Sequence, residues 1–388
     1  MELRTVGAGA LTVGAIGLGC MPMSWAYTAS QQRGDSSLRT VHTALDHGMS
    51  LLDTADMYGP FTNELLVGRV LKERRPEAFV STKCGLLVGE QHIVANGRPG
   101  YVKRACDASL RRLQTDVIDL YQLHRADPEV PIEDTWGAMA ELVTAGKVRA
   151  LGLCAIQKGS AKRVRRRSPG GERERIRAEA RPGAGMTGAG APGAGRVGAG
   201  GVRAGTPGDG RVRAGTSGAG GVRAGVYDAT VRQLERVQQV FPVSGVQAEL
   251  SVWSPEALEG LVPWCESRGI GFLAAMPLGN GFLTGTLTPG QGFEREDVRA
   301  RHPRFTAEMM AANQPVVAGL RRVGDRHGAT PAQTALAWVL AQGRHVVPVP
   351  GTKKEHWAEE NAQAATPRLT AQDLAEIGAL PPAKGSWD

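Results

Sequence analysis

The feature that most constrains the fold of this chain is an alternation of short apolar runs with longer amphipathic stretches. Stretches such as 101–113 and 131–146 have apolar residues at the spacing of a helix that covers a buried surface. Short runs that are apolar throughout are typical of strands buried on both faces, and their alternation with helices indicates a parallel sheet. The runs that we expect to be strands are 14–20, 48–55, 78–85, 117–124, 147–155, 244–252, 270–277 and 345–351.

Eight strand–helix units predict a (β/α)8 barrel, or TIM barrel, of the α/β class. The alternative is an open, doubly wound sheet that binds a dinucleotide at a G-x-G-x-x-G turn after its first strand. Here the first apolar run leads into "GLGCMP", which lacks that pattern, and the sequence has no P-loop motif. We therefore predict the barrel.

The barrel pattern is interrupted after the fifth expected strand by a segment of low complexity, residues 157–226. It holds 20 of the 52 glycines, has no aromatic residue, and repeats "GVRAG" or "RVRAG" every ten residues from position 201. Such a composition buries too little apolar surface to offset the entropy of ordering the backbone, so we predict a disordered insertion. Residues 1–156 then form the first part of the barrel and residues 227–388 the second part.

The positive charge of the chain is concentrated in this insertion. It carries 15 of the 46 Lys and Arg but 4 of the 38 Asp and Glu, so the remainder is slightly acidic although the net charge is +8. We therefore do not expect the protein as a whole to bind nucleic acid. Three interpretations of the insertion stay open: an inert expansion, which we favour, a basic arm for an acidic partner, and a lid over the catalytic face.

Cysteine usage and the N-terminus predict a cytoplasmic protein. Five cysteines, an odd number without a C-x-x-C pair, indicate reduced thiols. The N-terminus lacks the basic and apolar regions of a secretory signal, and no apolar run is long enough to span a membrane. We expect no metal site, no membrane contact, and a monomer or a small homo-oligomer.

Polar side chains stand at the ends of three consecutive expected strands, where barrel enzymes place their active sites. Asp53 ends the second run, Lys83 the third and His124 the fourth. Tyr58 follows Asp53 by five residues. Taken singly, each has an ordinary structural explanation, such as a cap for Asp53 or a surface position for Lys83. Together they suit proton transfer, because an ammonium lowers the pKa of a tyrosine, a carboxylate orients the ammonium, and a histidine binds a substrate oxygen.

The segments "DTADMYG", "STKCG" and "DLYQLH" resemble the three catalytic segments of the aldo-keto reductase superfamily, and the resemblance covers roughly 1–156 and 227–380. It implies a barrel that uses the cofactor NADP(H). Hydride passes from its reduced form, NADPH, to the carbonyl carbon of a small aldehyde or ketone. By this resemblance Tyr58 donates the proton and His124 orients the carbonyl oxygen. Lys83 and Asp53 adjust the pKa of the tyrosine.

The second half resembles the cofactor-binding half of the same family. "VQAELSVW" contains Gln247, at the position of a glutamine that contacts the nicotinamide carboxamide in relatives, and "PLGNGFLTG" (277–285) resembles the loop over the pyrophosphate. "PVPGTKKEHWAEEN" (348–361) resembles the adenosine 2′-phosphate segment, where two lysines favour NADPH over NADH. The alternative is an exposed lysine pair that opens a surface helix. The resemblance assigns to the cofactor Cys154, Gln247, Met276, Pro277, Leu278, Gly279, Gly351, Thr352, Lys353, Lys354, Glu360 and Asn361.

Two places depart from the family's pattern. Relatives have a serine and a polar residue where this chain has Cys154 and Ala155. Relatives also have a tyrosine that stacks under the nicotinamide, where this chain reads Ala-Met-Pro over 275–277. Trp253 either replaces that tyrosine or packs in the core. Trp25, after the first strand, either forms a wall of the substrate pocket or serves packing.

These departures leave two other functions open. One is a catalytically weak, cofactor-binding barrel that acts as a regulatory or interaction subunit, and the other is an Arg/Gly-rich module that binds nucleic acid. NADPH binding without turnover would favour the first, and steeply salt-dependent polynucleotide binding would favour the second. The carbonyl reductase is the function that we favour.

Overall fold

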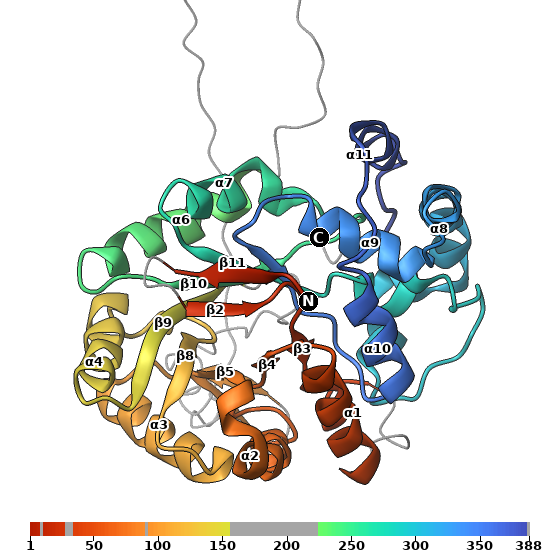
Figure 1. The fold of residues 1–388 in the computed structure, drawn as a ribbon. Helices are drawn as coiled ribbons and strands as arrows, with labels where there is room; N and C mark the ends of the chain where they lie inside the picture. The colour runs from red at the N-terminus through yellow and green to blue at the C-terminus, as the bar shows by residue number, and fades with distance from the viewer. Residues whose placement is uncertain (8–10, 28–33, 90–91, 156–223, 386–388) are drawn as a thin grey trace, which may run out of the picture. The chain divides into compact units, whose positions relative to one another are not determined.

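All eight predicted strands are present, and they form one parallel sheet that closes into a barrel (Figure 1). The ring closes where Gly19, at the end of the first barrel strand, forms a parallel bridge with Gly351, just after the last. At this seam Gly17 N donates to Pro348 O at 2.9 Å. The predicted fold class is therefore confirmed. In order around the ring, the strands are β3 (Leu18–Gly19), β4 (Leu51–Asp53), β5 (Phe79–Cys84), β8 (Ile118–Leu123), β9 (Val148–Ala155), β10 (Gly245–Glu249), β11 (Gly271–Ala275) and β12 (Val346–Pro348).

The computed structural model describes residues 1–7, 11–27, 34–89, 92–155 and 224–385. The predicted insertion, 157–226, lies outside the described residues except for its last three residues, where helix α6 begins. The parts of the chain on the two sides of it form one unit by their internal contacts.

Helices connect the strands and cover the outside of the barrel (Figure 1). The amphipathic stretch 255–269 is divided at Gly260 into the 3-10 helix η5 (Glu256–Glu259) and α7 (Leu261–Glu266). Two helices were not predicted, α8 (Ala307–Asp325) and α11 (Ala371–Gly378), and α8 contains Pro315, a residue that argues against a helix interior. The other helices are α1 (Gly34–Asp46), α2 (Thr62–Arg74), α3 (Pro99–Leu113), α4 (Ile132–Thr144), α6 (Ala224–Gln238), α9 (Pro331–Leu340) and α10 (Glu355–Gln363), with 3-10 helices η1 (Met21–Met23), η3 (Arg75–Glu77), η6 (Gly279–Thr284), η7 (Val298–Arg301) and η8 (Pro303–Phe305).

A hairpin that the sequence analysis did not predict, β1 (Leu3–Val6) with β2 (Leu11–Gly14), closes the N-terminal end of the barrel. Its inward residues Val6 and Val13 pack against apolar side chains from the barrel interior, and both are fully buried. A side chain at Gly271 would meet Val6 within 2.9 Å, so only glycine permits this approach. The interior side chains in this cluster are Leu51, Phe79, Leu120, Ala150, Leu273, Val347 and Val349.

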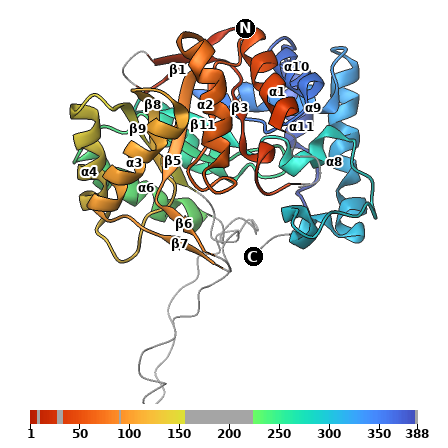
Figure 2. The same cartoon turned by 90° about the horizontal axis from the view of Figure 1, so that it is seen from below.

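A second hairpin, β6 (Leu86–Val88) with β7 (Ile93–Ala95), follows β5 and was also not predicted. Figure 2 shows it at the end of the barrel opposite the N-terminus, which is the end where the parallel strands terminate. The two hairpins therefore lie at opposite ends of the barrel. The first covers the apolar end, and the second lies at the end that holds the polar residues.

Among the described residues, no helix has both the length and the apolar character needed to cross a membrane. All five cysteines are buried and free.

We expect Val6→Ala to lower the free energy of unfolding by about 2 kcal/mol, because it removes two buried methyl groups and leaves a cavity. Urea denaturation measures the change. Leu3→Ala in the same strand is the matched control, because Leu3 is 60% exposed, and it should change stability by less than about 0.5 kcal/mol. Equal losses in the two variants would show that the hairpin does not pack into the barrel.

Candidate active site

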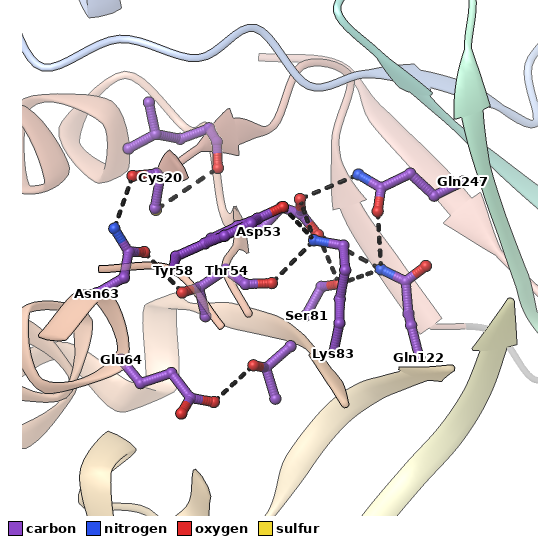
Figure 3. Close-up of polar contacts among 12 residues, drawn as sticks. Cys20, Asp53, Thr54, Tyr58, Asn63, Glu64, Ser81, Lys83, Gln122 and Gln247 are labelled. Carbon is purple, nitrogen blue, oxygen red and sulfur yellow. Dashed lines mark hydrogen bonds and ion pairs between the residues drawn. The ribbon is translucent and has the colours of Figure 1, made fainter. Parts of the chain in front are cut away.

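A buried ion pair joins the ends of β4 and β5. Lys83 Nζ lies 2.7 Å from Asp53 Oδ2, and the two side chains are 1% and 6% exposed (Figure 3). The ammonium also donates to the backbone oxygen of Thr54 at 2.8 Å. Burial is the largest single effect and disfavours the ammonium, but the contributions of Asp53, Tyr58 and Cys154 together exceed it, so the pKa of Lys83 lies above its usual value. The structure thus brings together the carboxylate and the lysine that the sequence predicted to pair.

Two further side chains fix the carboxylate of Asp53. Ser81 Oγ donates to Oδ1 at 2.9 Å, and Gln247 Nε2 donates to Oδ2 at 3.0 Å. Gln122 Nε2 links the set, because it lies 2.8 Å from Ser81 Oγ and 3.3 Å from Gln247 Oε1 (Figure 3). Ser81 and Gln122 were not predicted, although Ser81 stands two residues before Lys83 and Gln122 two residues before His124, which is the spacing of one strand face. Polar residues inside otherwise apolar runs are the signal that would have found them.

Tyr58 lies beside the ion pair, with its hydroxyl 3.5 Å from Lys83 Nζ and its ring centroid 5.2 Å from the same atom. Burial raises the pKa of Tyr58 to about 12, and the charge of Lys83 opposes that rise. We expected the pKa of Tyr58 to be lowered, and this expectation is wrong, because the sum of all effects raises it. Lys83 acts in the predicted direction, but desolvation of the phenolate is the larger effect.

His124 follows β8 and faces the tyrosine. The two rings are 5.9 Å apart and nearly perpendicular, and His124 is 3% exposed. Burial and the charges of Lys83 and Arg125 hold the pKa of His124 well below its usual value, so the imidazole is neutral. Among the described residues its buried Nδ1 has no hydrogen-bond partner. The ring can therefore offer a hydrogen bond to a ligand at the barrel mouth.

Trp25 also lies near the tyrosine, in the loop after η1. It packs against a small apolar cluster that includes Tyr58, Met57 and Leu86. A half-buried tryptophan in that position suits the expected pocket wall.

The residues assigned to the nicotinamide lie next to the pair of Asp53 and Lys83. Gln247 pairs in register with Cys154 on β9, and both are buried. Burial raises the pKa of Cys154 to about 12, so its thiol is uncharged. The side-chain amide of Gln247 contacts Asp53 and Gln122. Gln247 therefore lies between the predicted proton-transfer residues and the residues predicted to bind the cofactor.

The loop that resembles the pyrophosphate segment has an unusual backbone. Met276, Gly279, Asn280 and Gly281 all have positive φ, between 50° and 92°. A Cβ at Gly279 would lie 2.5 Å from the indole of Trp253, so this position requires glycine. Trp253 is 3% exposed and stacks on Phe282 with ring centroids 4.9 Å apart. This favours the packing interpretation of Trp253. Pro277 and Leu278 lie in the same loop, between Met276 and Gly279.

The segment assigned to the 2′-phosphate starts at the seam of the barrel. Thr352 is 4% and Lys353 8% exposed, and burial lowers the pKa of Lys353 while Asp297 opposes this. Lys354 Nζ lies 4.2 Å from the ring centroid of Trp357, and Thr352 Oγ1 accepts a hydrogen bond from Lys354 N at 3.2 Å. The lysine pair thus precedes α10, as expected.

The two residues expected at the adenine lie on α10. Glu360 Oε1 accepts a hydrogen bond from Thr330 at 2.6 Å, and Asn361 is 4% exposed.

Comparison with known proteins agrees with this geometry. The sequence model of the Aldo/keto reductase family matches residues 15–171 and 219–381. The chain belongs to the aldo/keto reductase family. The internal stretch that the family model leaves unmatched, 172–218, falls within the predicted insertion. A curated relative, probable aldo-keto reductase 1 of Glycine max, is 32% identical over 374 residues, which cover 96% of this chain and 86% of the relative. The predicted class, an oxidoreductase, is therefore confirmed.

Solved structures of this family share the fold. The glycerol dehydrogenase of Gluconobacter oxydans has a TM-score of 0.72 at 22% identity, with 97% of this chain and 94% of that chain covered. An aldo-keto reductase of Bacillus halodurans in its holo form has a TM-score of 0.66 at 21% identity, with 100% and 98% covered. An aldo-keto reductase of Klebsiella pneumoniae, in complex with NADPH, has a TM-score of 0.61 at 22% identity, with 99% and 97% covered.

We expect Lys83→Met to lower the free energy of unfolding of this aldo/keto reductase by about 3 kcal/mol, because it leaves a buried carboxylate without its cation. Ser81 and Gln247 still donate to Asp53, which limits the loss. Chemical denaturation measures it, and the double variant Asp53→Asn/Lys83→Met should regain part of the stability. A single variant as stable as the wild type would contradict the ion-pair interpretation.

Proposed function

We propose that this aldo/keto reductase reduces a small aldehyde or ketone to an alcohol with NADPH, and that Tyr58 donates the proton. The observation that carries the proposal is the position of one ammonium: Lys83 Nζ bonds Asp53 at 2.7 Å and reaches the hydroxyl of Tyr58 at 3.5 Å. This arrangement lies at the C-terminal end of the strands, where barrel enzymes carry out their chemistry.

The residues present fit a pyridine dinucleotide with a 2′-phosphate. The glycine-containing loop 276–281 exposes backbone in left-handed conformations, which suits close approach to phosphate groups. Thr352, Lys353 and Lys354 supply a hydroxyl and two ammonium groups at the start of α10, and cations of this kind suit a phosphate. In two solved structures of a Klebsiella pneumoniae relative the bound cofactors are NADP and NADPH.

NADPH, when bound, supplies the hydride. Tyr58 holds its proton throughout the neutral pH range because burial raises its pKa to about 12. The hydroxyl donates that proton to the carbonyl oxygen as negative charge develops there, and Lys83 stabilises the phenolate that forms. Neutral His124 orients the carbonyl oxygen through its ring, and Asp53 keeps Lys83 charged and in place. Trp25 forms one wall beside the reacting carbonyl.

We further propose a cytoplasmic location. Five buried thiols without a disulfide are typical of a reducing compartment.

Tyr58→Phe should retain NADPH binding and reduce carbonyl turnover by about 10²–10⁴-fold, because the general acid is lost while the ring stays. NADPH absorbance against a panel of aldehydes and ketones measures turnover, and fluorescence titration measures binding. Tyr227→Phe, a buried tyrosine on α6, is the matched control. Turnover near the wild-type value would exclude Tyr58 as donor, and NADPH binding by the wild type without any turnover would favour a binding subunit.

The double variant Lys353→Ala/Lys354→Ala should weaken NADPH binding by at least about tenfold while NADH binding changes little. Charge-assisted hydrogen bonds to a phosphate are each worth roughly 1.5–3 kcal/mol, and NADH lacks that phosphate. Titration with both cofactors measures the difference, and Lys72→Ala on the exposed face of α2 serves as control. Equal losses for the two cofactors would refute this role for the lysines.

A further inference from the structure

Asp56 is a buried carboxyl in the turn that carries Tyr58, and the mechanism above does not use it. It lies between β4 and α2, two residues before Tyr58, and is 3% exposed. Its backbone N donates to the backbone oxygen of Lys83 at 3.1 Å, and its backbone oxygen accepts from Phe61 N at 2.9 Å. A movement of Asp56 would therefore shift the backbone that positions both Tyr58 and Lys83.

The side chain of Asp56 has few partners for a buried acid. Oδ2 accepts one long hydrogen bond, 3.4 Å, from the hydroxyl of Tyr101 on α3. Oδ1 is buried and has no partner among the described residues. A buried carboxylate normally has a cation or several strong donors, because its desolvation is costly. The surroundings of Asp56 therefore fit the neutral acid better than the anion.

The neighbouring carboxyl, Glu64 on α2, contrasts with it. Glu64 is fully buried, and its two oxygens accept hydrogen bonds from Thr82 Oγ1 and Arg112 Nε, each at 2.7 Å. Arg112 also lies over the ring of Phe61, with its guanidinium carbon 4.6 Å from the centroid. Two buried carboxyls thus lie near one guanidinium, that of Arg112. Its hydrogen bond goes to Glu64 and leaves Asp56 without a cation of its own.

The electrostatics around Asp56 agree with this geometry. Burial raises the pKa of Asp56 to about 7, the charge of Glu64 raises it further, and Arg112, the backbone N–H of Met57 and the hydroxyl of Tyr101 oppose the rise. The titratable and charged groups that act on Asp56 or feel its charge are Glu64 on α2, Tyr101 and Arg112 on α3, Cys84 on β5 and Tyr121 on β8.

We propose that Asp56 is a positioning residue for Tyr58 that acts in its neutral form: the uncharged carboxyl holds the turn 54–61 against α3, and its ionisation moves that turn. A charge on Asp56 would face the carboxylate of Glu64 without a cation of its own, so the side chain would turn toward water and draw the backbone with it. The consequence for turnover rests on the proposed function of Tyr58. The ionisation of Asp56 and the movement of the turn 54–61 do not depend on that function.

The first test is the pH dependence of kcat for wild type and Asp56→Asn, which keeps the shape of the neutral acid. In the wild type, kcat should fall by about tenfold per pH unit on the alkaline side of neutrality, as for one group that must stay protonated. Asp56→Asn should match the wild type within about twofold near pH 6 and exceed it by about tenfold or more near pH 9. Glu73→Gln, the same chemical change at an exposed position of α2, should follow the wild type.

The second test needs no turnover. Because the pKa of folded Asp56 lies above the unfolded value of about 4, the folded state binds the proton more tightly. Its stabilising effect is fully present below about pH 4 and is lost as pH rises to about 7. The Tm of Asp56→Asn relative to wild type should therefore rise between about pH 5 and pH 7 and then level off. Amide exchange of the peptide 54–61 at about pH 8 should be roughly tenfold slower in Asp56→Asn than in wild type.

Each result decides the proposal. A pH-independent Tm difference, or equal exchange of 54–61 in both proteins, overturns it. The positioning role is also overturned if the Tm difference and the amide exchange behave as expected but the pH profile of kcat is the same in Asp56→Asn and wild type. Absence of turnover in every protein refutes the proposed function, while exchange still tests the turn. If Asp56→Asn does not fold, Tyr101→Phe replaces it, and loss of that donor should move the alkaline limb of kcat to higher pH; an unmoved limb overturns the proposal.

Discussion

The arrangement of the candidate site depends on the ion pair between Asp53 and Lys83, which lies inside the barrel at the ends of two neighbouring strands. A charge there is costly to desolvate, so each member needs the other together with additional hydrogen bonds. Ser81 and Gln247 supply those bonds to the carboxylate, and Thr54 accepts one from the ammonium. The same bonds fix the ammonium in direction, which is why it reaches the hydroxyl of Tyr58.

The barrel separates stability from chemistry along its axis. At one end, Val6 and Val13 of the N-terminal hairpin cover an interior of aliphatic and aromatic side chains. At the other end, Asp53, Lys83, Ser81, Gln122 and Gln247 are joined by an ion pair and hydrogen bonds. Because apolar burial at the closed end stabilises the fold, the open end can hold charged groups whose net contribution is small.

Sequence patterns predicted the barrel and the grouping of Asp53, Lys83, Tyr58 and His124 at one end of it, because both follow simple periodic rules. Runs apolar on both faces indicate buried parallel strands, and an ionisable residue at the end of such a run indicates a barrel mouth. The two hairpins escaped prediction because the prediction relied on strands that alternate with helices, whereas β1 leads directly to β2 and β6 to β7 without a helix between them. The net pKa of Tyr58 was mispredicted because it depends on burial, which neighbouring charges in the sequence do not reveal. Asp56 was overlooked because its significance comes from the bonds that it lacks.

The seam between Gly19 and Gly351 has a consequence for how the protein folds. A Cβ at Gly19 would lie 3.2 Å from Gly351 Cα, so the first and last barrel strands approach each other backbone to backbone. Their contact joins residues 19 and 351, which are far apart in the sequence, and such long-range contacts slow folding. Thr352 and Lys353 directly follow Gly351, so the position of this segment depends on the same contact. The closure of the ring and the placement of the segment at the start of α10 are therefore one event in folding.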